Sequence, residues 1–229
     1  MAVSIGTPTT AGLANGSTST TFSFVSTTDP LYVRVTGFFS GSPTACTYNS
    51  VSLTKIVESG LSSGTDDCQI WRLTSPTSGT HNVVLTHTST VAAGVISAAN
   101  VTGQDTTTPE GTPATAVSAS NGTATGSVTI TGAVTGDVTI VGVAVGIGQA
   151  VTPSASGGGA AAEEYDINSN NEEGEAFKAT DTTTSVSASW STSASWGIAA
   201  IPLKAPSGLP PGLGPDLHMQ PDMTMALGW

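Results

Sequence analysis

The sequence predicts an all-β protein, built as a two-sheet antiparallel sandwich of the jelly-roll kind with an extended C-terminal arm. Three observations support this prediction. Apolar and polar residues alternate with a period of two in about a dozen short segments, which is the pattern of half-buried strands. Turn-forming pairs such as Asn15-Gly16 and Asn121-Gly122 separate these segments. Of the 229 residues, 38 are Thr, 29 are Ser and 27 are Gly, and all three residue types are poor helix formers.

The first half of the chain contains the clearest alternation. Thr20–Ser26 places Phe22 and Phe24 on one face, and Leu31–Gly37 places its Leu and Val residues on one face and its polar residues on the other. The same pattern predicts further strands at Ala45–Asn49, Val51–Val57, Cys68–Thr74, Thr80–Thr88 and Val91–Val101.

A long connection, Asp105–Thr115, separates these strands from a second set. Val138–Val145 is apolar on both faces, which predicts a central strand covered on both sides. The other strands expected in this half are Ala116–Ser120, Gly126–Thr131, Glu175–Ala179, Thr183–Trp190 and Ser195–Leu203, and the central strand is expected to begin at Asp137.

Two segments depart from the alternation. Ser154–Glu175 holds 6 of the 16 acidic residues after a run of three glycines, which predicts a long solvated loop. Ala205–Trp229 holds 5 of the 13 prolines and three of the four methionines, and proline at this density prevents strand pairing. We therefore predict one β-sandwich domain over residues 1–204 and an extended arm over residues 205–229.

The arm is either a disordered tail or a segment that docks on another surface. Disordered tails are usually charged and poor in large apolar residues, whereas this arm is rich in them. We expect its partner-binding residues to be Leu209, Leu213, Leu217, Met219, Met223, Met225 and Trp229.

Charge and length exclude several classes of function. The chain has only five Lys and Arg residues and a net charge of −11. It therefore has no basic surface for nucleic acid. No run of 18 apolar residues is present, so we expect no membrane-spanning helix, and the first residues lack the basic and apolar regions of a signal peptide. The two cysteines, Cys46 and Cys68, are expected to be free thiols in a protein made in the cytoplasm.

Motifs for catalysis are weak. Ser62 lies in a Gly-x-Ser-x-Gly match, but this motif needs a strand-to-helix turn and here stands between two β segments. His81 and His87 are six residues apart on one predicted strand, which is about 20 Å, too far to share a metal ion. We therefore expect no enzymatic activity and no catalytic residue.

Binding motifs are equally sparse. Asp166–Asn170 resembles the start of a calcium loop, but Asn171 replaces the turn glycine and Phe177 the bidentate acid. We expect no cofactor, with calcium at Asp166–Asn170 as a minor alternative. Trp71, Trp190 and Trp196 are interpreted as core residues, with a sugar-stacking platform as the alternative.

Several phrases together resemble a known group of domains. They are Val51–Lys55, Trp71–Val84, Val101–Pro109, Gly136–Ile140 and Trp196–Lys204, with Trp190. These phrases, within Phe22–Lys204, are similar to jelly-roll domains of tailed-phage virion proteins and of some bacterial surface proteins. In that group, short stand-alone chains resemble head decoration (cement) proteins or fibres, and fused copies resemble adhesion or carbohydrate-binding modules. The resemblance supplies no fixed binding residues.

These observations favour a non-enzymatic phage structural protein, a capsid decoration protein at the virion surface that is synthesised in the host cytoplasm. The expected partner is the major capsid protein or another virion subunit, and homo-oligomers are expected, with a trimer suited to local three-fold positions. The alternative is a carbohydrate-binding or adhesion module of a tail or cell-surface protein.

Overall fold

The chain folds into strands and connecting loops. The computed structural model describes residues 1–207 except 14–15, 61–65, 88–90, 119–122, 147 and 170–171. These residues form 18 strands and no helix, which confirms the predicted all-β sandwich class. Among them there is no helix long and apolar enough to cross a membrane.

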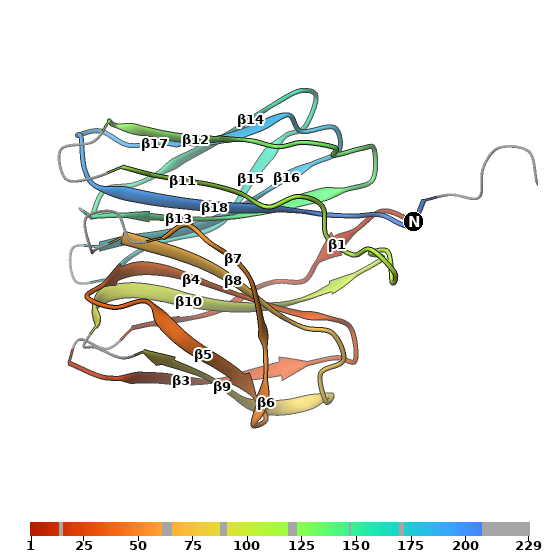
Figure 1. The fold of residues 1–229 in the computed structure, drawn as a ribbon, viewed down its shortest axis with the longest axis horizontal. Helices are drawn as coiled ribbons and strands as arrows, with labels where there is room; N and C mark the ends of the chain where they lie inside the picture. The colour runs from red at the N-terminus through yellow and green to blue at the C-terminus, as the bar shows by residue number, and fades with distance from the viewer. Residues whose placement is uncertain are drawn as a thin grey trace, which may run out of the picture.

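The strands form four antiparallel sheets stacked as layers (Figure 1). In spatial order, the first outer sheet contains β3 (Ser19–Ser26), β9 (Gly79–His87), β5 (Pro43–Tyr48) and β6 (Val51–Ser52). The first inner sheet contains β1 (Ser4–Ile5), β10 (Val91–Thr102), β4 (Leu31–Phe39), β8 (Asp66–Leu73) and β7 (Thr54–Glu58), and β2 (Thr9–Gly12) also pairs with β10. The second inner sheet contains β11 (Ala114–Ser118), β18 (Trp196–Leu203), β13 (Val138–Val145), β16 (Glu172–Thr180) and β15 (Ala161–Ser169). The second outer sheet contains β12 (Thr125–Thr129), β17 (Ser185–Ser189) and β14 (Thr152–Ser156).

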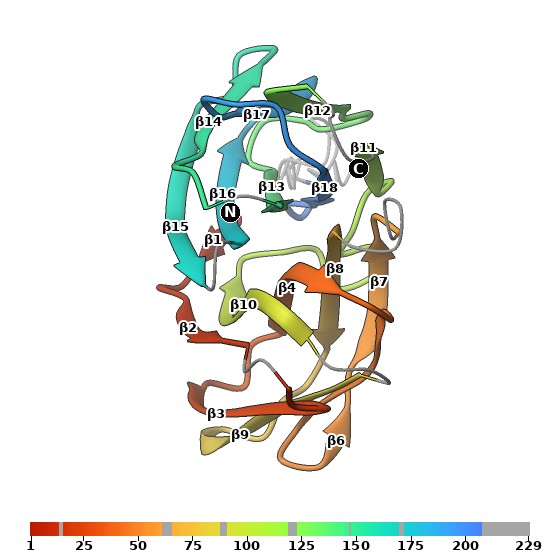
Figure 2. The same cartoon turned by 90° about the vertical axis from the view of Figure 1, so that its left-hand side faces the viewer.

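The same strand order occurs twice. Without the two-residue strands β1 and β6, each half has eight strands, which we number one to eight. In the first half they are β2, β3, β4, β5, β7, β8, β9 and β10, and in the second half they are β11 to β18. Each inner sheet then has the order one, eight, three, six, five, and each outer sheet has the order two, seven, four. Pairing of the first strand with the last, and of the second with the seventh, is the arrangement of a long hairpin rolled into a jelly roll. Two jelly-roll-like sandwiches therefore lie one above the other (Figure 2).

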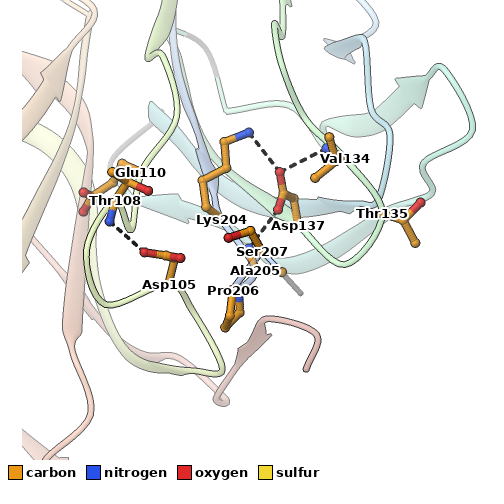
Figure 3. Close-up of a pocket in the computed structure, with 10 residues that line it drawn as sticks. All are labelled: Asp105, Thr108, Glu110, Val134, Thr135, Asp137, Lys204, Ala205, Pro206 and Ser207. Atoms are coloured by element: carbon orange, nitrogen blue, oxygen red, sulfur yellow. Dashed lines mark hydrogen bonds and ion pairs between the residues drawn. The ribbon is translucent and has the colours of Figure 1, made fainter. Parts of the chain in front are cut away.

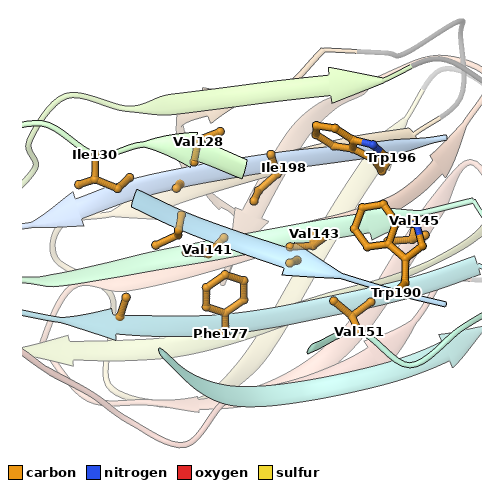
Figure 4. Close-up of a cluster of buried hydrophobic side chains, with 14 of the residues drawn as sticks. Val128, Ile130, Val141, Val143, Val145, Val151, Phe177, Trp190, Trp196 and Ile198 are labelled. Atoms are coloured by element: carbon orange, nitrogen blue, oxygen red, sulfur yellow. The ribbon is translucent and has the colours of Figure 1, made fainter. Parts of the chain in front are cut away.

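Each sandwich has its own apolar core. The core of the first half lies between its outer and inner sheets and includes Phe24, Tyr48 and Trp71. The core of the second half includes Phe177 and is filled at one end by Trp190 and Trp196, whose rings meet edge to face at 6.1 Å (Figure 4). Strand β13 is buried at every residue, in the middle of its sheet, which confirms the prediction for Val138–Val145.

The two inner sheets pack against each other to join the halves. The third strands of the two halves, β4 and β13, contact each other. The sixth strand of each half contacts the eighth strand of the other, so that β8 contacts β18 and β10 contacts β16. This is the arrangement of a two-fold dimer. Small residues of the second inner sheet allow the close approach. A Cβ atom at Gly174 would lie 2.7 Å from Thr36 Oγ1 and 2.8 Å from Val95 Cγ2. We predicted residues 1–204 as one domain, and that boundary stays a prediction.

The prediction of a solvated loop over Ser154–Glu175 is wrong. Strand β14 covers Thr152–Ser156, and β15 and β16 form a hairpin over most of the remainder. The acidic residues misled the prediction because one of them is neutralised inside the protein. Glu164 forms an ion pair with Arg34, and the two side chains are only 4% and 3% exposed.

Candidate functional site

The arm leaves the body beside a cavity of about 420 Å³ (Figure 3). Three segments line it: the connection between the two halves, the loop before β13, and residues Lys204–Ser207 after β18. We call Lys204–Ser207 together with Asp137 the arm root. It is the best-defined candidate site because it determines where the predicted arm begins.

Asp137 organises the arm root from the end of the loop that precedes β13. Its side chain is completely buried. One carboxylate oxygen accepts a hydrogen bond from the backbone N–H of Ala205 at 2.8 Å. The other accepts from the backbone N–H of Val134 and from Lys204 Nζ, each at 3.0 Å. Because three donors converge on one carboxylate, Asp137 fixes the direction in which residue 205 leaves the last strand.

The connection between the halves holds the arm root from the other side. The N–H of Asp105 donates to the carbonyl of Lys204 at 2.7 Å, and the N–H of Lys204 donates to the carbonyl of Pro109 at 2.9 Å. The N-terminal segment reaches the same place, since the N–H of Val3 donates to the carbonyl of Gly136 at 3.0 Å. The arm root therefore joins four separate parts of the chain.

Most of the side chains that line this cavity are polar or small. Asp105 caps its own loop by accepting from the N–H groups of Thr108 and Thr107, each at 2.8 Å. These backbone hydrogen bonds lower the pKa of Asp105 below its ordinary value. Val134 on the rim is 55% exposed. The arrangement anchors a segment and offers a contact surface: Asp105 and Asp137 hold backbone N–H groups, and Glu110 forms an ion pair with Arg72.

Replacing Asp137 with Asn is expected to lower the free energy of unfolding by about 2 kcal/mol, because an amide turns an NH2 group toward donors that now lack an acceptor. Chemical denaturation of the purified variant measures this loss. Asp181→Asn is the matched control: the side chain of Asp181 accepts one hydrogen bond, from the N–H of Gly136 at 3.0 Å, and the amide oxygen of Asn can accept the same bond. Equal effects of the two variants would contradict the role assigned to Asp137.

A second polar cluster lies where β7 and β8 pair. Gln69 donates to Asp67 at 2.8 Å and to Glu58 at 3.0 Å, and accepts from the indole N–H of Trp71 at 3.0 Å. Burial raises the pKa of Asp67 above its ordinary value. Burial also acts to raise the pKa of Glu58, but hydrogen bonds led by the one from Lys55 outweigh it, and the pKa is lowered. This cluster satisfies its own donors and acceptors, so we assign it to holding the sheet edge.

The two histidines of the described residues and both cysteines lie in the first half. His81 and His87 share one face of β9, where His81 packs edge-on against Tyr48 at 5.5 Å and His87 lies 6.2 Å from Phe39. Cys46 and Cys68 both keep their thiols and form no disulfide, as predicted. They belong to different apolar clusters, and burial raises the pKa of the Cys46 thiol to about 12.

The three tryptophans of the described residues are buried, with Trp71 at 4% and both Trp190 and Trp196 at 7% exposure. The core interpretation is confirmed, and these side chains form no exposed platform. Asp166 lies on β15, where it accepts from the N–H of Val151 at 3.0 Å. Asn170 lies outside the described residues, and calcium binding stays a prediction. The described residues contain no group of three side chains able to hold a metal ion.

Two predicted sites fall outside the part of the chain that the structure describes. Ser62 lies in the gap at 61–65. The seven arm residues all lie beyond residue 207: Leu209, Leu213, Leu217, Met219, Met223, Met225 and Trp229. The role of Asp137 was missed, although an Asp placed directly before an apolar strand is a typical signal for capping the preceding turn.

Comparison with protein-family models, with curated proteins and with solved structures finds no match to this chain. The function is therefore inferred from the residues and their geometry.

Proposed function

We propose that this chain is a non-enzymatic virion structural protein, a capsid decoration protein whose arm over residues 205–229 anchors a β body to the head shell. The observation that carries the proposal is the arm root. Asp137, Lys204 and the connection between the halves hold the start of the arm at one end of the body. An apolar segment that begins at a rigid, defined place suits attachment to a neighbouring subunit.

The arm has the composition of an anchor. Its leucines, methionines and C-terminal Trp229 supply large apolar side chains, and such side chains contribute most of the binding energy when they fill pockets of a partner. Its five prolines restrict the free segment and reduce the entropy lost on binding.

The distribution of charge in the body supports a structural role. Every Asp, Glu, Lys and Arg in the described strands belongs to one of the two inner sheets. The strands of both outer sheets are rich in Ser and Thr and contain no Asp, Glu, Lys or Arg. Two neutral, hydroxyl-rich faces can pack beside other subunits without desolvating charges, which is costly.

The test uses empty shells assembled from the major capsid protein of the same virus. The full chain is expected to cosediment with these shells. A chain that ends after Ser207 is expected to bind them with a Kd at least about a hundredfold higher. A full-length control with all seven arm residues replaced by Ser separates loss of apolar anchors from loss of length. Unchanged binding of the shortened chain, with an unchanged melting temperature, would overturn the anchoring role.

The carbohydrate-binding alternative loses its main support, because Trp71, Trp190 and Trp196 are buried. What remains for it is a polar cavity of about 360 Å³ on the first outer sheet, lined by residues that include Asn49, His81 and Asn82. Hits on a glycan array that an Asn82→Ala variant loses would favour this alternative over the structural role.

A further inference from the structure

Strand β3 is an open edge of the first outer sheet. It pairs with β9 over all eight of its residues without a break in register, and its other side has no neighbouring strand among the described residues. The N–H of His87 donates to the carbonyl of Thr18 at 3.1 Å. In an antiparallel pair such bonds fall on alternate residues, so Thr21, Ser23 and Val25 direct their backbone groups away from β9. These three residues are exposed, Val25 to 68%.

The other sheet edges of the described chain carry features that prevent pairing with a second chain. Charged residues and a break in register mark β7 and β15, and Pro153 lies in β14. The strands β1, β2 and β6 have two, four and two residues. The five-residue strands β11 and β12 lie against each other. Strand β3 has none of these features: it has eight residues, no charge, no proline and no bulge.

The core beneath this edge is incompletely covered. Phe22 of β3 and Ala11 of β2 are only partly buried where they pack against the first core. At the equivalent side of the second half, β11 and β12 close the sandwich, and the partly buried residues there include Ala114, Ala116 and Ala124. The first half therefore leaves a partly buried aromatic side chain at an edge that, among the described strands, is free to pair.

We propose that β3 binds β3 of a second copy of this chain, joining two first outer sheets into one continuous sheet. An antiparallel pairing centred on Phe22 places the two Phe22 side chains opposite each other, and aromatic pairs stabilise such contacts. It also brings the outward backbone groups of Thr21 beside those of Ser23 in the second copy. The contact is isologous, so it closes as a dimer.

Charge favours a second copy as the partner. The chain has a net charge of −11, yet its first 28 residues contain no Asp, Glu, Lys or Arg. Because β2 and β3 both belong to this segment, two copies of the negatively charged chain can approach here without side-chain charges of like sign facing each other across the contact. The proposal goes beyond attachment to a shell, and it concerns a different part of the molecule from the arm.

The test is sedimentation velocity of the full chain over a range of concentrations. We expect a monomer–dimer equilibrium, and we expect Ser23→Lys to raise its Kd roughly tenfold or more, because like charges then meet across the pairing. Ser127→Lys is the matched control, since Ser127 is an exposed residue of β12, the strand equivalent to β3. Mixing Ser23→Lys with Ser23→Glu is expected to restore the dimer.

Ser23 is exposed, so the variant should keep its fold, and an unchanged melting temperature verifies this. A chain that stays monomeric at every concentration would overturn the proposal. So would an oligomer that Ser23→Lys leaves intact, or one that Ser127→Lys weakens equally. A trimer that withstands Ser23→Lys would place the self-association on another surface.

Discussion

Replacing Glu164 with Ala is expected to lower the free energy of unfolding by about 3–5 kcal/mol, the usual cost of removing one partner from a buried ion pair. Glu164 and Arg34 are 4% and 3% exposed between the two inner sheets. The guanidinium of Arg34 also lies over the Tyr165 ring, 5.9 Å from its centroid. Without Glu164, the positive charge of Arg34 would remain buried without its carboxylate, and the halves would have to separate or admit water.

A bulge in β15 makes this geometry possible. The register between β15 and β16 shifts between Glu163 and Tyr165, and such a shift re-aims the side chains beside it. Glu164 and Tyr165, although consecutive, therefore both reach Arg34.

The control for the ion pair is Glu163→Ala, which removes an acid from an exposed position on the same strand and is expected to change stability by no more than about 0.5 kcal/mol. Urea denaturation compares the two variants. The double variant with Arg34→Met should recover part of the loss, because it removes the unpaired charge. Equal effects of Glu164→Ala and Glu163→Ala would contradict the buried pair.

Replacing Gly174 with Ala is expected to lower the free energy of unfolding by about 1–3 kcal/mol, the usual cost of overpacking. Its Cβ atom would lie 2.7 Å from Thr36 Oγ1 and 3.0 Å from Val95 Cβ. These atoms belong to the opposite inner sheet, so the two sheets would have to move apart. The change tests the contact that joins the two halves.

Two further variants sharpen this test. Gly6→Ala is the control, because its Cβ would meet the Asn100 carbonyl at 3.4 Å, close to ordinary contact. Combining Gly174→Ala with Val95→Ala should cost less than the sum of the two single changes, since the shorter side chain removes one of the clashes. Strict additivity in denaturant unfolding would show that Gly174 and Val95 do not meet.

The sequence was informative wherever burial follows a simple period. Val138–Val145 was identified as a central strand because apolar residues on both of its faces can only be covered by neighbouring layers. Strand β15 and the first residues of β16 were missed because acidic residues were assumed to face water, whereas the strand predicted at Glu175–Ala179 lies within β16. Glu164 instead pairs with Arg34, which lies 130 positions earlier in the chain, and no local sequence pattern indicates a partner at that distance.

The repeated strand order was also invisible in the sequence. The two halves share the order of their strands, but different large side chains fill their cores: Phe24, Tyr48 and Trp71 in the first, and Phe177, Trp190 and Trp196 in the second. Of the candidate site, the sequence predicted the arm by its composition. It could not predict the arm root, because the hydrogen bonds from Ala205 and Lys204 to Asp137 join residues that are 68 and 67 positions apart.

The arm as anchor is tested most directly by amide hydrogen exchange of the full chain, free and bound to empty shells. On binding, residues 208–229 are expected to become protected, because an apolar segment that docks in a groove forms hydrogen bonds and loses contact with water. The strands of both inner sheets should exchange as they do in the free chain. Equal exchange of residues 208–229 in the free and bound chain, with new protection on a sheet of the body, would contradict the account.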